Sequence, residues 1–110
     1  MKNIALKIAA TIFAALMLGP AQSALAGENI IIDGSTTVGP IAKAFAEFYK
    51  ESHPDVNITI SESGSGNGVK SLINKACNIA NLSRFMKDSE FKSCVANGVL
   101  PVAHVVAFDG

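Results

Sequence analysis

The apolar and polar residues of this chain follow two different spacings, which predicts strands and helices in turn. Short β-branched runs are typical of buried strands, and three occur: Asn29–Asp33, Val56–Ile60 and Asn78–Leu82. Apolar residues at helical spacing predict a helix after each run: Val38–Glu51, Val69–Ala76 and a segment from Lys87 to Asn97-Gly98. Strand–helix repetition of this kind predicts an α/β fold with a mostly parallel sheet and helices on both faces.

Two further features complete the predicted fold. The first helix should turn one apolar face inward, made of Ile41, Ala42, Phe45, Phe48 and Tyr49. The run Val99–Phe108 predicts a fourth and longest strand, with His104 packed at least partly inside. The chain ends directly after this strand, at Asp109-Gly110, with no element to cover that side of the sheet. We therefore expect the chain to be cut from a longer domain.

The first 26 residues have the pattern of a targeting segment. Lys2 and Lys7 precede an apolar stretch, Ile8–Leu18, that is short for a membrane span. Gly19-Pro20 then breaks the helix, and Ala24-Leu25-Ala26 matches a small-residue cleavage site. This predicts a cleavable signal peptide over residues 1–26 and an exported domain over 27–110. A retained membrane anchor is the alternative.

Charge and cysteine content narrow the classes of partner. Removing Lys2 and Lys7 leaves seven basic residues against nine acidic ones, a net charge of −2 for the exported part. The absence of a basic patch argues against nucleic acid as a partner. Cys77 and Cys94 would enter an oxidising compartment, and their spacing matches neither a CxxC redox motif nor a zinc motif. A disulfide between them and two buried thiols both remain open.

Glycine-rich turns follow the first two predicted strands and open the next helices. The second turn, Ser63–Gly68, would point the backbone amides of Gly66 and its neighbours and the hydroxyl of Ser65 at the positive end of a helix dipole. The first turn, Gly34–Thr37, would offer Thr36 and Thr37 in the same way. Two such turns on one sheet predict an anion site. The alternative is that these residues only cap helices.

The glycine-rich turn comes close to known catalytic and phosphate-binding motifs but does not match any of them. Val69 stands where a P-loop starting at Gly64, or a G-x-G-x-x-G fingerprint, needs glycine, and no nucleophile elbow fits. Ser83-Arg84 follows the third strand, so that Arg84 would pair with an anion through two hydrogen bonds or remain a solvated surface arginine. The sequence shows no metal-ligand cluster and no paired carboxylates. We therefore predict no catalytic residues, no metal and no cofactor.

Three segments resemble a known family. Gly34-Ser35-Thr36-Thr37-Val38-Gly39-Pro40, Gly64-Ser65-Gly66-Asn67-Gly68-Val69-Lys70 and Ile79-Ala80-Asn81-Leu82-Ser83-Arg84, with the closing Asp109-Gly110, are similar to the phosphate-binding proteins of ABC phosphate importers (the PstS type). The resemblance implies a type II-like periplasmic-binding-protein fold, of which this chain is part of the first of two lobes. It also implies anion contacts at Thr36, Thr37, Ser65 and Ser83. Where many members have a glycine-rich segment, this chain has Ala80-Asn81-Leu82.

The function expected from this resemblance is binding without a reaction. The chain would belong to a monomeric periplasmic protein that captures inorganic phosphate and delivers it to the membrane permease of an ABC importer. Asp109 is the candidate acceptor for the proton that phosphate carries and sulfate lacks, and its alternative role is a turn with Gly110. Sulfate, molybdate or tungstate are alternative ligands. A secreted enzyme acting on phosphate esters and a small structural or adhesion module are alternative classes.

Overall fold

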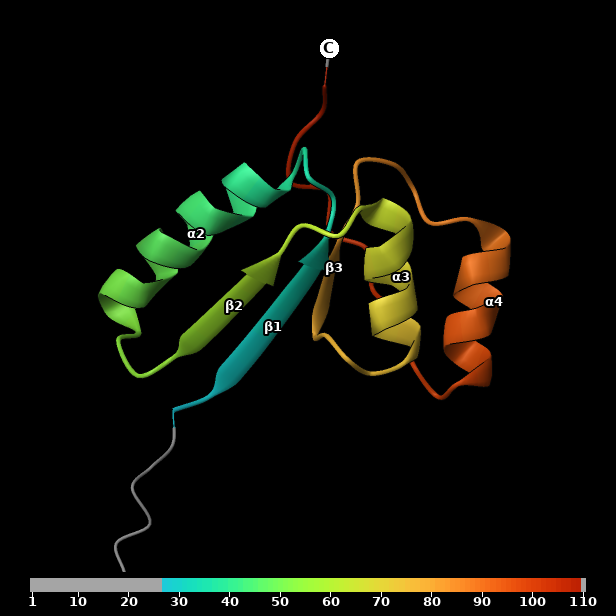
Figure 1. Ribbon diagram of the computed structural model, residues 1–110, viewed down its shortest axis with the longest axis horizontal. Helices are drawn as coiled ribbons and strands as arrows, with labels where there is room; N and C mark the ends of the chain where they lie inside the picture. The colour runs from blue at the N-terminus through green and yellow to red at the C-terminus, as the bar shows by residue number, and fades with distance from the viewer. Residues whose placement is uncertain (1–26, 110) are drawn as a thin grey trace, which may run out of the picture.

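A computed structural model describes residues 27–109, and the predicted signal peptide lies outside these residues. Three strands, β1 (Asn29–Gly34), β2 (Asn57–Ser61) and β3 (Ile79–Asn81), form a parallel sheet in the order β2-β1-β3 (Figure 1). The register pairs Asp33 in β1 with Ser61 in β2 and Ala80 in β3. The carboxyl ends of all three strands therefore meet at one edge of the sheet.

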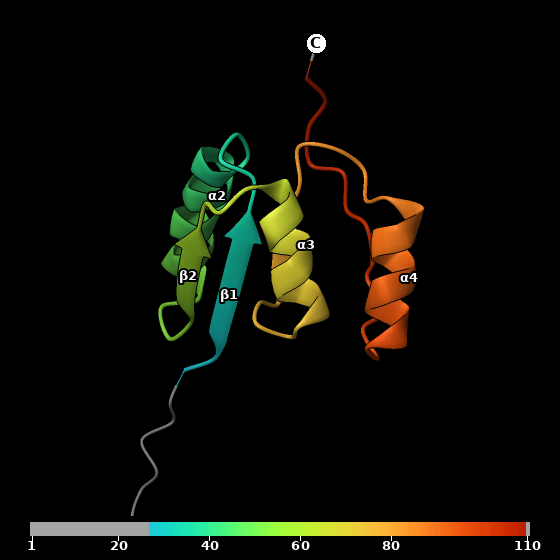
Figure 2. The ribbon, with the colours of Figure 1, turned by 45° about the vertical axis from the view of Figure 1, so that its right-hand side comes forward.

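Three helices follow the strands along the chain: α2 (Gly39–Ser52), α3 (Ser65–Ile73) and α4 (Asp88–Ala96). The chain moves from β1 outward to β2 and then back across β1 to β3, and right-handed crossovers in opposite directions place their helices on opposite faces. Figure 2 shows this arrangement, with α2 behind the sheet and α3 in front of it. The predicted α/β class, parallel sheet and two-sided helical cover are confirmed.

The second helix differs from its prediction, because it begins at Ser65 and ends at Ile73 rather than spanning Val69–Ala76. Gly64, the last of the three residues between β2 and α3, adopts a φ of 103° that glycine tolerates. The residues after it are then free to start the helix four positions early. At the other end, Lys75 adopts a φ of 57° and the Ala76 N–H donates to the Ser71 carbonyl, which ends the helix.

The predicted fourth strand is wrong. Residues 99–109 have no regular secondary structure, and His104, expected to pack inside, is exposed. Most large apolar side chains of this segment are also exposed, with Phe108 at 88%. A β-branched run forms a strand only where it finds a pairing partner, and the neighbouring edge of the sheet is β3, which is three residues long.

The predicted inward face of α2 is also wrong in part. Ala42 is buried, but Phe45 and Phe48 are 56% and 75% exposed, and Ile41 and Tyr49 are exposed as well. The helix lies mainly over β2, the outer strand on that side, so that one narrow stripe of small residues faces the sheet. The spacing of the apolar residues predicted the helix correctly and its burial incorrectly.

The best-buried apolar side chains belong to α3, α4 and the segment between them. Val69 is 1% exposed and Cys94 is fully buried, and Cys77 is buried beside α3, where its thiol lies 3.9 Å from the Gly68 carbonyl. Both cysteines are free thiols, which answers the question that the sequence left open. Among residues 27–109, no helix is long and apolar enough to cross a membrane.

Candidate functional site

The turns that follow the three strands are joined by main-chain hydrogen bonds. The Gly64 N–H donates to the Gly34 carbonyl at 2.7 Å, which ties the turn after β2 to the turn after β1. The Ser35 N–H donates to the Asn81 carbonyl at 2.8 Å, which ties the turn after β1 to the end of β3. All three predicted hydroxyl-bearing turns therefore lie at one edge, as expected for a ligand site of a parallel α/β sheet.

Two of the predicted site residues meet directly at this edge. The hydroxyl oxygens of Ser65 and Ser83 are 3.2 Å apart and share a hydrogen bond, and the Ser83 N–H also donates to Ser65 Oγ at 3.2 Å. Ser65 opens α3 and Ser83 follows β3, so the contact spans 18 positions of sequence. The structure thus gathers hydroxyl and amide donors from two separate turns.

The start of α3 leaves further donors at the same place. Its first helical bond runs from the Gly68 N–H to the Gly64 carbonyl, so the N–H groups of Ser65, Gly66 and Asn67 precede the helical ladder. The N-cap is Gly64, which has no side chain to occupy them. The capping alternative therefore does not apply to the Ser65 hydroxyl, which bonds to Ser83 instead.

The first turn contains a structural serine that the sequence reasoning passed over. Ser35 is buried, and its hydroxyl oxygen accepts hydrogen bonds from the N–H groups of Thr37 (3.1 Å) and Val38 (3.3 Å). This is a local side-chain-to-backbone turn that leads into α2, and a serine three residues before the helical pattern was the available signal. Thr36 and Thr37 are exposed beside it. At this turn the hydroxyl that satisfies the backbone amides ahead of α2 is therefore that of Ser35.

Gly68 allows α3 to lie close to β1, and Gly34 allows the end of β1 to lie close to the end of β3. A Cβ at Gly68 would lie 2.6 Å from the Gly34 Cα and 2.7 Å from the Asp33 carbonyl oxygen. A Cβ at Gly34 would overlap the carbonyl oxygen of Asn81. At both positions the neighbouring atoms are backbone atoms, which cannot move aside to make room for a side chain. The helix start is therefore positioned by close backbone contact.

Asp33, at the end of β1, is a further member of this region that the sequence reasoning missed. Its two carboxylate oxygens accept hydrogen bonds from the hydroxyls of Ser63 (2.6 Å) and Ser71 (2.7 Å). These bonds, first from Ser63 and then from Ser71, lower the pKa of Asp33 below its usual range. A carboxylate directly before the first glycine turn was the signal that could have indicated it.

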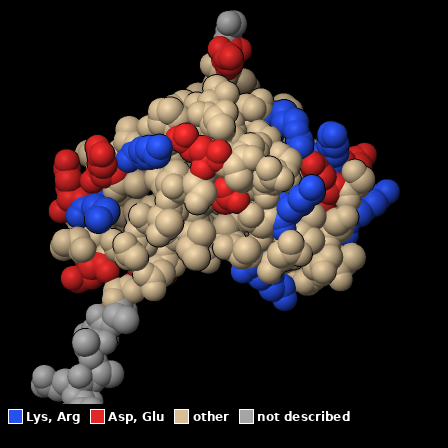
Figure 3. All heavy atoms as spheres, in the orientation of Figure 1, with Lys and Arg blue, Asp and Glu red and all other residues tan. Residues whose placement is uncertain are grey.

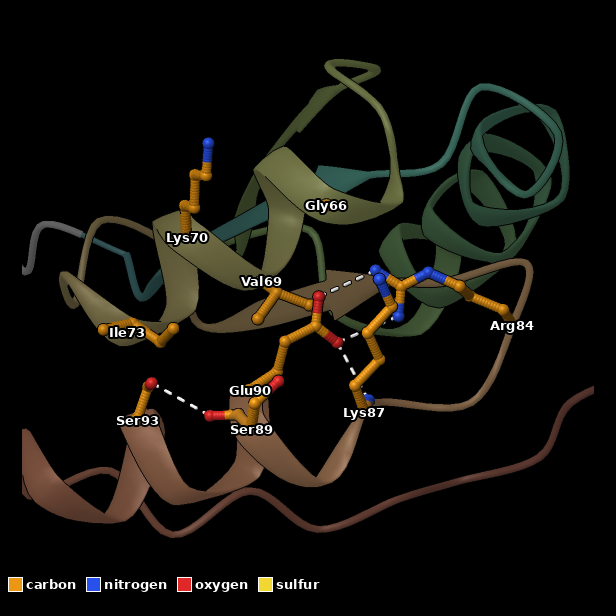
Figure 4. A pocket seen from close by; sticks show the side chains of 9 residues that line it. All are labelled: Gly66, Val69, Lys70, Ile73, Arg84, Lys87, Ser89, Glu90 and Ser93. Carbon is orange, nitrogen blue, oxygen red and sulfur yellow. Dashed lines mark hydrogen bonds and ion pairs between the residues drawn. The ribbon is translucent and has the colours of Figure 1, made fainter.

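The structure pairs Arg84 with a neighbouring carboxylate. Figure 4 shows its guanidinium bonded through two nitrogens to Glu90 of α4, at 2.9 and 2.8 Å. The Lys87 N–H also donates to Glu90 at 2.9 Å. These contacts, led by the Arg84 hydrogen bonds, lower the pKa of Glu90 from 4.5 to about 2. In this arrangement Arg84 holds the segment after β3 against the start of α4.

Asp109, the predicted acceptor, directly follows the segment that was expected to form the fourth strand. It is exposed near the end of the irregular segment 99–109, because the strand expected to place it at the sheet edge is not formed. The described residues do not include its neighbour Gly110, so the turn alternative stays a prediction.

Charge is distributed unevenly around the site. Figure 3 shows basic side chains gathered over α3 and α4, whereas acidic ones appear near the carboxyl ends of β1 and β2. Within residues 27–109, no group of three His, Cys, Asp or Glu side chains could hold a metal ion. The donors at the edge are neutral hydroxyls and backbone amides. Such a set can bind an oxyanion through several hydrogen bonds and a helix dipole.

Comparison with known sequences identifies the family. Residues 19–110 match the family model of the PBP superfamily domain. Protein SphX of Synechococcus elongatus is 39% identical over 84% of this chain, and the phosphate-binding protein PstS of Staphylococcus saprophyticus is 33% identical over 84%. The chain spans only 28% and 29% of the lengths of these two relatives.

A solved structure extends the comparison to the fold. The substrate-binding protein of a phosphate ABC transporter from Clostridium perfringens, described as putative and crystallised with bound phosphate, superposes with a TM-score of 0.58 at 38% identity. The match covers 60% of this chain and 27% of the other. The resemblance to phosphate-binding proteins of the PstS type is confirmed, and the chain belongs to the PBP superfamily.

Proposed function

We propose that this chain forms part of the first lobe of a periplasmic protein that captures inorganic phosphate for an ABC importer. The observation that carries the proposal is the contact between Ser65, at the start of α3, and Ser83, after β3. It places two hydroxyls beside the free amides of a helix start. The names of the relatives support phosphate as the anion.

The proposed contacts come from the three turns at the sheet edge. Thr36 and Thr37 supply donors from the first turn, Ser65 and Gly66 from the start of α3, and Ser83 from the turn after β3. Arg84 is left out of this set because its guanidinium is engaged by Glu90. Asp109 is left out because it is exposed on a segment without regular structure.

The same proposal gives the protein its location and partners. A signal peptide over residues 1–26 would export the domain 27–110, and a membrane permease would receive the ligand. A cluster of neutral donors suits reversible binding of an anion, whereas hydrolysis of a phosphate ester needs a nucleophile with a base or metals. Binding without catalysis is therefore the function that the site supports best.

The test is a titration of the isotope-labelled chain with phosphate, followed by the NMR shifts of its backbone amides at constant ionic strength. We expect the shifts to concentrate at Thr36, Thr37, Ser65, Gly66 and Ser83. One lobe leaves the anion partly hydrated, so the dissociation constant should be on the order of 1 mM. Shifts spread evenly over the surface, or confined to α4, would contradict the proposed site.

Ser65→Ala is the informative variant, because it removes one hydroxyl and leaves the helix amides in place. A hydrogen bond to a charged group contributes about 1.5–3 kcal/mol, so the variant should bind phosphate roughly tenfold more weakly or worse. Ser93→Ala is the matched control, since the Ser93 hydroxyl bonds to the Ser89 carbonyl of its own helix. Equal losses in both variants would mean that Ser65 makes no ligand contact.

Two further measurements separate the alternatives. Sulfate, molybdate and tungstate should shift the same amides less than phosphate does at equal concentration. An equal or larger response to one of them would make that anion the ligand. Turnover of a chromogenic phosphate ester by the purified chain would favour the enzyme alternative, and we expect none.

A further inference from the structure

Asp33 connects three segments that the proposed phosphate site depends on. It is the last residue but one of β1, while Ser63 lies in the turn after β2 and Ser71 lies in the second turn of α3. The serine hydroxyls donate to different oxygens of the carboxylate, Oδ1 at 2.6 Å and Oδ2 at 2.7 Å. The residues between the two serines include Ser65 and Gly66. The carboxylate therefore binds one residue before the start of α3 and one residue after it.

The two hydrogen bonds that Asp33 accepts from Ser63 and Ser71, called the clamp below, are of a strong type. Bonds to an ionised acceptor are shorter and stronger than bonds between neutral groups. Both hydroxyls contribute to lowering the pKa of Asp33, so the folded chain favours the ionised form. The side chains of Ser63 and Ser71 are satisfied by Asp33, and nothing in these contacts requires a ligand.

The clamp acts on a helix start that has few other side-chain restraints. The N-cap, Gly64, has no side chain and a φ of 103°, and a Cβ at Gly66 would meet no atom within 4 Å. Asn67 adds one bond, from its side-chain nitrogen to the Ser63 carbonyl at 2.7 Å. That bond fixes Asn67 to the same turn that Asp33 holds. The orientation of the Ser65 and Gly66 amides thus depends on where Ser63 and Ser71 are held.

We propose that Asp33 is a positioning residue for phosphate binding: its carboxylate bridges Ser63 and Ser71 and so holds the amides of Ser65 and Gly66 in their ligand-binding orientation. This inference rests on the proposed function. Asp33 does not contact the anion, because the negative charge of its carboxylate would repel the phosphate. The carboxylate contributes through the geometry of the helix start alone.

Ser71→Ala tests the clamp without changing the charge beside the anion. Alanine is also the better helix former, so a loss of affinity would not come from a weaker α3. We expect roughly fivefold weaker phosphate binding in the amide-shift titration, a size common for residues that act through a shared network. Ser71→Thr retains the hydroxyl and should restore most of the affinity. Ser93→Ala is the control in another helix and should bind as the unmodified chain does.

A double-mutant cycle assigns the effect to Asp33. In an Asp33→Asn background, the further change Ser71→Ala should cost nothing, because the clamp is already broken. The same additional loss in both backgrounds would overturn the proposal, and so would unchanged affinity in Ser71→Ala alone.

Amide relaxation of the unliganded chain separates failure of this inference from failure of the proposed function. The order parameters of Ser65 and Gly66 should fall in Ser71→Ala and stay unchanged in Ser93→Ala. If phosphate gives no localised shifts in the unmodified chain, the proposed function fails and the positioning role for phosphate fails with it. If phosphate binds but the order parameters do not change, only the clamp is wrong.

Discussion

The helices α2 and α3 have similar apolar patterns in sequence, but their large apolar side chains are exposed in α2 and better buried in α3. In α3, Gly68 and Val69 are buried against the sheet, and the helix start lies in close contact with the backbone of β1. In α2, burial is limited to Gly39 and Ala42, and Phe45 and Phe48 are exposed. Periodicity reports which residues share a face, whereas burial depends on what lies opposite that face. The site lies on the side where the opposing element is the central strand.

The contact between Gly68 and β1 should give the largest effect on stability. Gly68→Ala places a Cβ 2.6 Å from the Gly34 Cα, and backbone on both sides cannot move away cheaply. We expect a loss of about 2–3 kcal/mol in the free energy of unfolding, measured by urea denaturation.

Gly66→Ala is the matched control for that measurement, two residues earlier in the same helix. A Cβ at Gly66 meets no atom within 4 Å, so alanine should stabilise the helix by about 0.5–1 kcal/mol. If both variants lose the same stability, close backbone contact is not what places α3.

The Arg84–Glu90 pair should give a smaller effect that depends on pH. The folded-state pKa of Glu90 is about 2, below its ordinary 4.5, so the pair contributes stability above pH 4.5 and loses it as pH falls towards 2. Glu90→Gln should be less stable than the parent chain above pH 4.5, and the difference should shrink towards pH 2. Thermal melts of both proteins across this range measure it. A difference that is independent of pH would mean that the ion pair is not its source.

The exposed face of α2 should give the smallest effect. Phe48 is 75% exposed, so Phe48→Ser should change the free energy of unfolding by no more than about 0.5 kcal/mol. On α3, Val69→Ala removes two buried methyl groups and should cost about 2 kcal/mol. Denaturation of the two variants side by side measures the contrast between the helices. A large loss for Phe48→Ser would show that the α2 face is covered in solution.

The features predicted from sequence were those set by local pattern. The first three strands and the positions of α2 and α4 depend on β-branched runs and helical spacing, and all were placed to within a few residues. The meeting of Ser65 with Ser83 was also predictable, since parallel strands bring their carboxyl ends to one edge.

What the sequence did not reveal depends on partners distant along the chain. Val99–Phe108 has the composition of a strand, but among residues 27–109 it pairs with no strand of the sheet. Arg84 has the chemistry of an anion ligand, and its selection of Glu90 is decided by where α4 begins. Asp33 can bridge two segments only once the fold brings Ser63 and Ser71, 30 and 38 positions away, within hydrogen-bond distance of it. The local signal, a carboxylate before a glycine turn, does not say which distant hydroxyls the carboxylate will bind.

The main-chain bonds between the turns have a consequence for how the site opens. Loop amides normally exchange their hydrogen with water readily, but the N–H groups of Ser35 and Gly64 donate to carbonyls at the ends of other segments. To expose them, the chain must separate the end of β1 from the end of β3 or from the turn that starts α3. Their exchange should therefore be slower than that of ordinary loop amides, because these turns must separate from one another before either N–H group meets water.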